Sequence, residues 1–256
     1  MIHLSYTNIT PQFKRLNPVR IYISWACMII CTILIKPVSA QTNQNFLQII
    51  QSPMRLEQDF KLDSKRKPLE MLQFIAAKPG SQVLDILSGG GYTAQLLALA
   101  VGPSGKVLAF NTRANQNLQD RLIANPQSNI LPVLGNLNDL IPDSNGPVDM
   151  ITIINSYHDM VNANPNIQIT NQRIYQLLKL GGILIVRDHE ALEGVGKTAT
   201  KTLHRIEPAA VIADFEAVGF KKVSEGDFLK NSQDAKEEHW NKLSTPAGFI
   251  LKFIKM

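Results

Sequence analysis

Cysteine is nearly absent from this chain of 256 residues. Its two cysteines, Cys27 and Cys31, both lie within the first 40 residues, and none follows Ala40. Beyond Ala40 the chain therefore has no internal disulfide, no thiolate metal ligand and no cysteine nucleophile. A cysteine-free body is compatible with an oxidising compartment, where unpaired thiols are a liability.

Acidic residues are missing from the first 40 residues, which carry four basic ones and thus most of the net charge of +5. The rest of the chain is close to neutral, and its longest basic run is Lys65–Lys67. We interpret that triplet as a solvated helix start, because a nucleic-acid surface needs a wider basic patch. The composition therefore predicts no nucleic-acid partner.

The amino-terminal segment has the pattern of a secretory signal peptide. Basic residues precede the apolar stretch Ile21–Ile35, Pro37 then interrupts a helix, and Val38 and Ala40 are the small residues that a signal peptidase reads. This predicts a signal peptide over residues 1–40 and an exported, periplasmic protein with no membrane span in the mature chain. Because the apolar stretch is long for a signal peptide, an uncleaved membrane anchor is the alternative.

The segment Val83–Thr93 carries the most information about function. Val83–Leu87 is apolar except for Asp85, as in a strand buried on both faces. Gly89–Gly91 permit a tight turn and a close approach of the backbone to a ligand, and the helix that follows directs free N–H groups toward it. A carboxylate in an apolar strand is costly without a partner, so Asp85 either braces the loop or accepts from a bound cation or hydroxyl. The pattern predicts a nucleotide-type site, with a ligand-free turn as the alternative.

Beyond this loop, apolar strand patterns alternate with helical ones. Strands are predicted at residues 83–87, 106–110, 130–134, 148–154, 183–186, 220–223 and 248–254. Such alternation indicates an α/β domain built on a mostly parallel sheet. We therefore divide the chain into the signal peptide at 1–40, a linker with a lead helix at 41–62, and one domain at 63–256.

The spacing of the glycines alone is compatible with two kinds of cofactor, a dinucleotide and S-adenosylmethionine. Gly89 to Ala94 satisfies G-x-G-x-x-A, the dinucleotide fingerprint. That fingerprint expects an acidic residue about 20 positions later for the ribose hydroxyls, and Asn111 stands there instead. A nicotinamide cofactor is disfavoured by this residue but stays open.

The loop more closely resembles that of class I S-adenosylmethionine (SAM)-dependent methyltransferases. Asp85 stands where they carry an acidic residue in the first strand, and Gly89 and Gly91 match their glycines, although Leu87 replaces an earlier one. The segments LKLGG (178–182) and EAVGF (216–220) extend the resemblance over roughly residues 63–256. More narrowly, NSYHD (155–159), RDH (187–189) and TLHRIE (202–207) resemble a group of predicted bacterial methyltransferases that often carry signal peptides.

The resemblance implies a Rossmann-like, seven-stranded, mostly parallel sheet that ends in an antiparallel hairpin and has helices on both faces. It also implies SAM as the cofactor. The cofactor-binding residues would then be those at the ends of the first four strands: Asp85, Ser88, Gly89, Gly90, Gly91, Asn111, Asn136, Leu137 and Asn155. Among these, Asn111 would hold the ribose, and Asn136 with Leu137 the adenine.

Polar clusters follow the fourth and fifth predicted strands, where ligands bind in open α/β sheets. Three of the five histidines of the chain lie in them or just beyond, and histidine is the usual general base near neutral pH. The candidate catalytic residues are Tyr157, His158, Asp159, His189 and His204. A structural role for them in bracing loops is the alternative. A metal site from His158, His189, His204 and Asp188 is conceivable, but their spread over separate loops disfavours it, and we predict no metal.

Taken together, these patterns predict an exported enzyme that transfers a methyl group from SAM to a small or medium-sized acceptor. A nicotinamide-dependent oxidoreductase and a non-catalytic ligand-binding protein on the same fold are the alternatives. Export conflicts with the cytosolic synthesis of SAM, which keeps these alternatives open.

The first prediction concerns the amino terminus. Cleavage is expected between Ala40 and Gln41, because Val38 and Ala40 flank that bond in the pattern that a signal peptidase reads. Amino-terminal sequencing of the protein from its native host checks this. An intact start at Met1 in the membrane fraction would instead support the anchored form.

Overall fold

The computed structural model describes residues 45–256. The predicted signal peptide, its cleavage site and the first residues of the predicted linker lie outside this range. Within it, no helix combines the length and hydropathy that crossing a membrane requires. Residues 45–50 are helical and bury Phe46 against the core, so this part of the predicted linker is packed.

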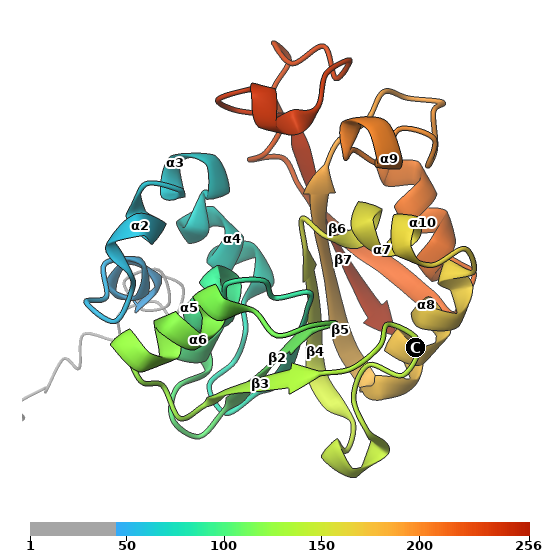
Figure 1. The fold of residues 1–256 in the computed structure, drawn as a ribbon. Helices are drawn as coiled ribbons and strands as arrows, with labels where there is room; N and C mark the ends of the chain where they lie inside the picture. Colours follow the sequence, from blue (N-terminus) through green and yellow to red (C-terminus); the bar gives the residue numbers. More distant parts are fainter. Residues whose placement is uncertain (1–44) are drawn as a thin grey trace, which may run out of the picture. The chain divides into compact units, whose positions relative to one another are not determined.

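A seven-stranded sheet forms the centre of the domain (Figure 1). Its strands are β1 (Gln82–Ile86), β2 (Lys106–Asn111), β3 (Ile130–Leu134), β4 (Val148–Ile154), β5 (Leu178–His189), β6 (Phe220–Gly226) and β7 (Gly248–Lys255). They lie in the order β3-β2-β1-β4-β5-β7-β6, and all neighbours pair in parallel except β7, which is antiparallel to β5 and to β6. The predicted Rossmann-like sheet with its closing antiparallel hairpin is confirmed.

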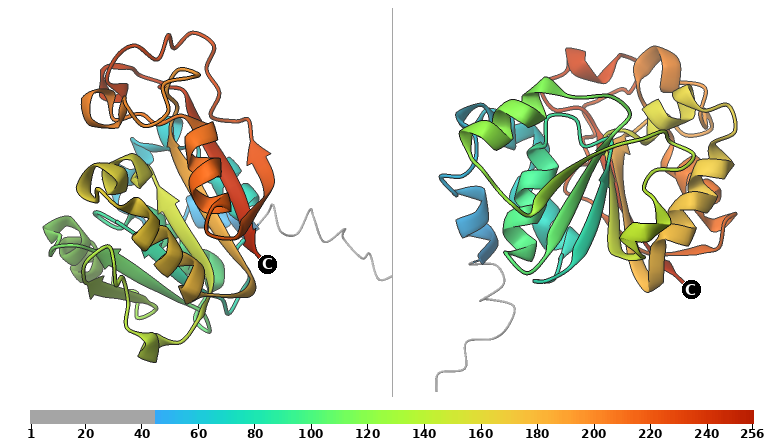
Figure 2. Two further views of the ribbon diagram at one scale, coloured as in Figure 1. Left: turned by 90° about the vertical axis from the view of Figure 1, so that its right-hand side faces the viewer. Right: turned by 60° about the horizontal axis from the view of Figure 1, so that its bottom comes forward.

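Helices cover both faces of the sheet, as predicted. They are α2 (Glu57–Phe60), α3 (Asp63–Arg66), α4 (Pro68–Ile75), α5 (Tyr92–Val101), α6 (Gln116–Ala124), α7 (Tyr157–Ala163), α8 (Ile167–Leu177), α9 (Thr200–Leu203) and α10 (Pro208–Glu216), with the 3₁₀ turns η1 (Asp143–Asn145) and η2 (Trp240–Lys242). Helices α4, α5 and α6 cover one face, and α8 and α10 the other (Figure 1). Figure 2 turns the second face toward the viewer, where α8 and α10 lie across the strands.

The core is divided by the sheet into two apolar layers. One layer packs the side chains of α7, α8 and α10 on the sheet, with Phe215 and Phe253 fully buried. The other packs α4, α5 and α6, with Leu72 and Leu96 fully buried. Because parallel strands between two such layers are buried on both faces, β1 and β4 read as almost unbroken apolar runs.

The ends of β5 and β6 differ most from the prediction. Helix α8 ends at Leu177, and β5 then begins at Leu178, five residues before the predicted strand, and ends three residues after it at His189. Strand β6 runs to Gly226, three residues beyond its predicted end. The register between β4 and β5 shifts between Val148 and Met150, which accommodates these extra residues. Pro132 lies in the edge strand β3, as its missing N–H predicts.

The sheet order sets where the polar residues meet. Strand β4 lies between β1 and β5, with Asp85 beside Thr152 and Ile154 beside Arg187. The glycine loop after β1 and the polar segments after β4 and β5 therefore leave the same edge of the sheet, as the sequence predicts.

Candidate functional site

The glycine loop turns sharply between β1 and α5. Leu87, Gly89 and Gly91 all have left-handed φ values, of 54°, 56° and 80°. Leu87 thus adopts the glycine-like backbone that its place in the loop requires, at a cost of about 1–2 kcal/mol for a residue with a Cβ. The Asn111 side chain accepts from the N–H of Gly89 (2.9 Å) and donates to its carbonyl (3.3 Å), which fixes the turn to the end of β2.

The glycines of the loop have different surroundings. A Cβ added to Gly89 would meet no atom within 4 Å, whereas one added to Gly91 would lie 2.6 Å from Cδ1 of Leu118 in α6. Gly91 therefore permits close packing of α5 on α6, and Gly89 faces open space. That space is a cavity of about 630 Å³, which the loop shares with Arg66, Asn155 and Trp240 among others.

Asp85 lies at the base of this cavity and is only 1% exposed. Its Oδ1 accepts from the Thr152 hydroxyl at 2.6 Å, while Oδ2 has no hydrogen-bond partner within residues 45–256. Burial raises the pKa of Asp85 to about 6, and the bond from Thr152 offsets this only in part. An ionised carboxylate with a free oxygen here is suited to a positively charged ligand group.

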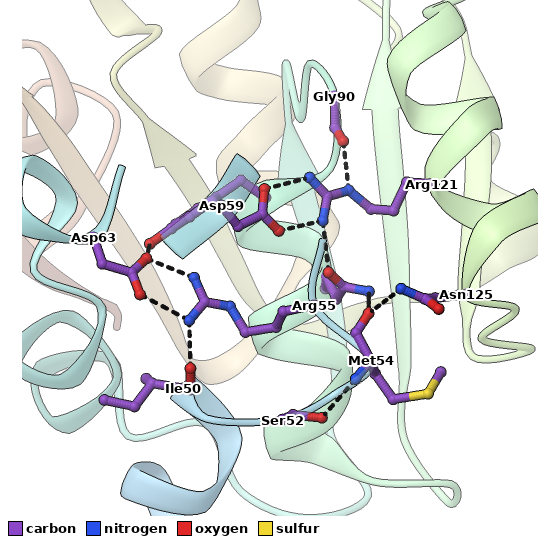
Figure 3. A network of polar contacts seen from close by, with 11 residues as sticks. Ile50, Ser52, Met54, Arg55, Asp59, Asp63, Gly90, Arg121 and Asn125 are labelled. Carbon is purple, nitrogen blue, oxygen red and sulfur yellow. Dashed lines mark hydrogen bonds and ion pairs between the residues drawn. The ribbon is translucent and has the colours of Figure 1, made fainter. Parts of the chain in front are cut away.

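Arg121 connects the lead segment, residues 45–67, to the glycine loop (Figure 3). Its guanidinium is buried and forms two hydrogen bonds with the Asp59 carboxylate, while Nε donates to the Gly90 carbonyl at 2.7 Å. Nη1 also donates to Oε1 of Gln95, whose Nε2 donates to the Met54 carbonyl. One cation thus holds α2, α5 and the loop in a fixed arrangement.

A second arginine completes the attachment of the lead segment. Arg55 forms an ion pair with Asp63, which also accepts from the Tyr92 hydroxyl at 2.6 Å. Arg66 lies with its guanidinium carbon 4.4 Å from the centre of the Tyr92 ring and lines the cavity. No carboxylate of residues 45–256 pairs with Arg66, and its charge faces the cavity. From the basic triplet we had expected Arg66 to face bulk solvent.

A second cavity, of about 880 Å³, lies over the ends of β2 and β3. Asn136 and Leu137 line it together with Thr112. The Asn136 amide is engaged in its own turn, where Oδ1 accepts from the N–H groups of Asn138 and Asp139. Asn136 presents this turn to the cavity, and Leu137 supplies apolar surface.

His158 and Asp188 form a tightly coupled pair after β4 and at the end of β5. His158 Nδ1 lies 2.7 Å from Asp188 Oδ1, and Oδ2 accepts from the His158 N–H. Burial lowers the pKa of His158, but the hydrogen bond and the charge of Asp188 outweigh it and raise the pKa above its usual value. Nε2 of His158 lies 3.2 Å from Nδ1 of His204, so the structure brings these two predicted residues together.

His189 is separated from that pair. Its ring stacks on Trp240, with centroids 4.3 Å apart and planes 7° apart, and lies 6.3 Å from the His158 ring. Burial lowers the pKa of His189 to about 3, so its ring is neutral near pH 7. Because Trp240 lines the cavity at the glycine loop, the stacked ring of His189 supports that part of the cavity wall.

Tyr157 is not available to a substrate in this structure. Its side chain is fully buried, and its hydroxyl donates to Asp214 and accepts from Asn171, which lies in α8. Burial raises the pKa of Tyr157 well above its usual value. The first turn of α7 directs Tyr157 into the core and His158 toward His204. This position does not favour the predicted catalytic role of Tyr157, which stays a prediction.

The sequence did not identify Arg66 or the pair of Arg121 and Asp59. For His239 and Trp240, in the charged segment before β7, the sequence favours surface packing or a substrate rim, and Trp240 lines the cavity wall. The pair of Arg121 and Asp59 joins positions far apart in the chain and leaves no local signal. A run of three basic residues just before Pro68 was the one available hint of Arg66.

The model of the ubiE/COQ5 methyltransferase family matches residues 58–204, more than half of the chain. No curated protein matches the sequence significantly. The family match begins within α2 and covers the glycine loop and the polar segments after β4 and β5 up to His204.

Solved structures with the same fold are distant in sequence. A SAM-dependent methyltransferase from Aquifex aeolicus has a TM-score of 0.59 and 16% identity, over 86% of this chain and 100% of that one. The N-methyltransferase NodS from Bradyrhizobium japonicum has a TM-score of 0.54 and 12% identity, over 74% and 95%. The [4+2]-cyclase SpnF has a TM-score of 0.59 and 15% identity, over 85% and 93%. At these identities the likeness shows the fold alone.

The second prediction concerns the buried carboxylate of Asp85. Its pKa in the folded chain is about 6, against 3.8 when exposed, so folding disfavours its ionised form. Below about pH 4 the carboxyl group is protonated in both the folded and the unfolded chain, and its burial is not penalised. As the pH rises through 6, the free energy of unfolding falls by about 3 kcal/mol, because the unfolded chain ionises this group more readily. Asp85→Asn should therefore raise the free energy of unfolding by about 1–3 kcal/mol at pH 8 and change it little at pH 4.5, as measured by urea denaturation.

The exposed carboxylate of Asp143 offers a matched control. Asp143→Asn should change stability by less than about 1 kcal/mol at either pH, because its ion pair with Arg173 is at the surface. A loss of stability at pH 8 in Asp85→Asn would contradict the account of Asp85 as a buried carboxylate whose ionisation destabilises the fold.

The third prediction concerns the guanidinium that anchors the lead segment. Arg121→Met should cost about 3–5 kcal/mol of unfolding free energy, because it leaves Asp59 buried without its partner. Lys222→Met, which breaks the exposed pair with Glu225, should cost less than about 1 kcal/mol. Equal losses in the two variants, measured by chemical denaturation, would show that Arg121 does not hold the segment in place.

Proposed function

The chain belongs to the ubiE/COQ5 methyltransferase family, and we propose that it transfers the methyl group of SAM to a small or medium-sized acceptor. The observation that carries this proposal is the glycine loop, whose Gly89 faces a cavity of about 630 Å³ at the carboxyl edge of the sheet. This edge is where open α/β sheets bind their ligands.

The charges of the cavity suit the two ends of an amino acid. Asp85 offers a buried carboxylate oxygen that has no partner among the residues the structure describes, and this oxygen can accept from an ammonium group. Arg66 offers a guanidinium that no carboxylate of the described chain neutralises, which can bind a carboxylate. The amino-acid part of SAM carries both groups, so the residues present fit this half of the cofactor.

The adenosine half would extend toward the second cavity. Leu137 and the turn at Asn136 would flank the adenine, while Ser88, Gly90 and Asn155 would line the path from the loop. Asn111 already makes two hydrogen bonds to Gly89, so its main contribution would be to hold the loop in the binding conformation. It would contact the ribose only by giving up one of these bonds.

SAM supplies an electrophilic methyl group, and the protein supplies the arrangement of the reactants. Two reactants held in line react as if at very high concentration, which accounts for much of the rate in such reactions. Trp240 and the end of β4 would close the cavity on the acceptor side and exclude water. The acceptor would contact His158 and Asp159, which lie in α7 just after β4, and His204 beside them. His189 would position Trp240 by stacking on it.

The alternatives have less support. A nicotinamide-dependent oxidoreductase would need an acidic residue at the end of β2, where Asn111 is bound to the loop. A protein that binds SAM without transferring its methyl group would need the same cavity. The fold is also that of SpnF, a [4+2]-cyclase, so fold alone does not decide the reaction. An assay for transfer of the methyl group is therefore needed beside any binding assay.

The fourth prediction tests the cofactor site. Gly89→Val places a branched side chain in the cavity where the backbone must approach the ligand, and should lower SAM affinity at least about tenfold in calorimetry. Gly102→Val is the matched control, because Gly102 also has a positive φ and open space around its Cβ but lies after α5 and outside the cavity.

Both variants should lose about 1–3 kcal/mol of stability, because both place a side chain at a positive φ. The control should lose at least as much, because φ 67° with ψ −173° at Gly102 is a region essentially restricted to glycine. Only Gly89→Val should lose SAM binding. Unchanged affinity in a folded Gly89→Val variant would mean that the loop is a turn without a ligand.

A further inference from the structure

We propose that His158, Asp159 and His204 form a binding site for a divalent transition-metal ion, with zinc as the ion that fits best. Three potential ligand atoms meet here: Nε2 of His158, Oδ1 of Asp159 and Nδ1 of His204. These residues lie in the described part of the chain as one group whose ligand atoms are all within 4.8 Å of one another.

The three atoms form a nearly equilateral triangle. Nε2 of His158 lies 3.2 Å from Nδ1 of His204 and 3.3 Å from Oδ1 of Asp159, and Nδ1 of His204 lies 3.3 Å from the same oxygen. Ligands about 2.0–2.1 Å from a tetrahedral zinc ion are about 3.3–3.4 Å apart. The edges of an octahedral magnesium site are shorter, about 2.9 Å. The triangle therefore has the size of one face of a zinc tetrahedron.

The ligand types agree with this size. Two imidazoles and one carboxylate are a donor set of zinc sites that keep a fourth position open. Magnesium prefers oxygen ligands and is not expected to compete for two histidine nitrogens. The site we infer therefore has three protein ligands and one position for water or another small molecule.

A second, independent observation is the way Asp188 holds His158. Asp188 Oδ1 lies 2.7 Å from Nδ1 of His158, and this contact directs Nε2 toward the other two ligand atoms. Histidines that bind metals usually donate their other ring N–H to a carboxylate, which fixes the tautomer and orients the ring. Asp188 is buried and also accepts from the backbone N–H of His158, so its position is fixed before any ion binds.

Access to the site is open on one side. The side chains of Asp159 and His204 are 50% and 38% exposed, whereas that of His158 is 2% exposed. An ion can therefore enter from solvent and meet a preformed ligand at the base. His189 does not belong to this set, because its ring stacks on Trp240. The site thus differs from the metal set considered from the sequence, since Asp159 replaces His189 and Asp188 acts as the support.

The fifth prediction is that the full chain retains about one zinc ion per molecule. The chain would be treated with a chelator, dialysed, loaded with ZnCl₂, desalted and measured by elemental analysis, with MgCl₂ in a parallel sample. His204→Ala and Asp159→Asn should each lower zinc affinity at least about tenfold in calorimetry, because each removes one of three ligands. Asp143→Asn, which removes an exposed carboxylate elsewhere, should leave zinc binding unchanged.

Thermal unfolding without zinc checks that each variant is folded, and Asp159→Asn is the safer variant because Asp159 is half exposed. At the same concentration, zinc should also raise the melting temperature of the parent chain more than that of Asp159→Asn. The proposal is overturned if the parent chain retains no zinc. It is also overturned if the folded variants retain as much zinc as the parent, because the ion is then held elsewhere, for example by Cys27 and Cys31. These measurements need no SAM, so they succeed or fail independently of methyl transfer.

Discussion

The buried guanidinium of Arg121 is the contact on which the arrangement of the cofactor cavity depends. It joins the Asp59 carboxylate in α2, the Gln95 amide in α5 and the Gly90 carbonyl in one network (Figure 3). A charge buried in this way is costly unless every partner is in place. Residues 45–67 and the glycine loop therefore support each other, and the docked segment places Arg66 at the cavity wall.

The cavity itself keeps features that weaken the fold. Asp85 is ionised at neutral pH in a setting that raises its pKa to about 6, and Leu87 holds a left-handed backbone without being glycine. Strain of this kind persists where the surrounding structure fixes it, and it is concentrated at functional sites. A cationic ligand would relieve the cost at Asp85, so ligand binding and stability are expected to be coupled.

The sequence predicted the fold well because its signals are local. Apolar runs of strand length, Gly89–Gly91 and the stop at Gly219 each mark an element by its own residues, and their order implied the seven-stranded sheet. The edge position of β3 followed from Pro132. The start of β5 was missed because Leu178–Gly182 reads as a helix end followed by a turn, although pairing with β4 makes it strand.

The site was only partly predictable, since side-chain directions depend on packing. The sequence located His158, His204 and Asp85 at the correct edge, but it could not tell that α7 directs Tyr157 into the core. It also gave no sign that Trp240 stacks on His189, because η2 reaches that position through a long irregular segment. Contacts between residues far apart in the chain, such as Arg121 with Asp59, have no counterpart in local sequence.

Native mass spectrometry of the chain with SAM, S-adenosylhomocysteine and NAD⁺ tests most directly whether the glycine-loop cavity is a methyltransferase cofactor site. We expect one molecule of SAM or S-adenosylhomocysteine per chain, and no retention of NAD⁺ at the same concentration. Retention of NAD⁺ in preference to both, or of none of the three by a folded chain, would contradict the account.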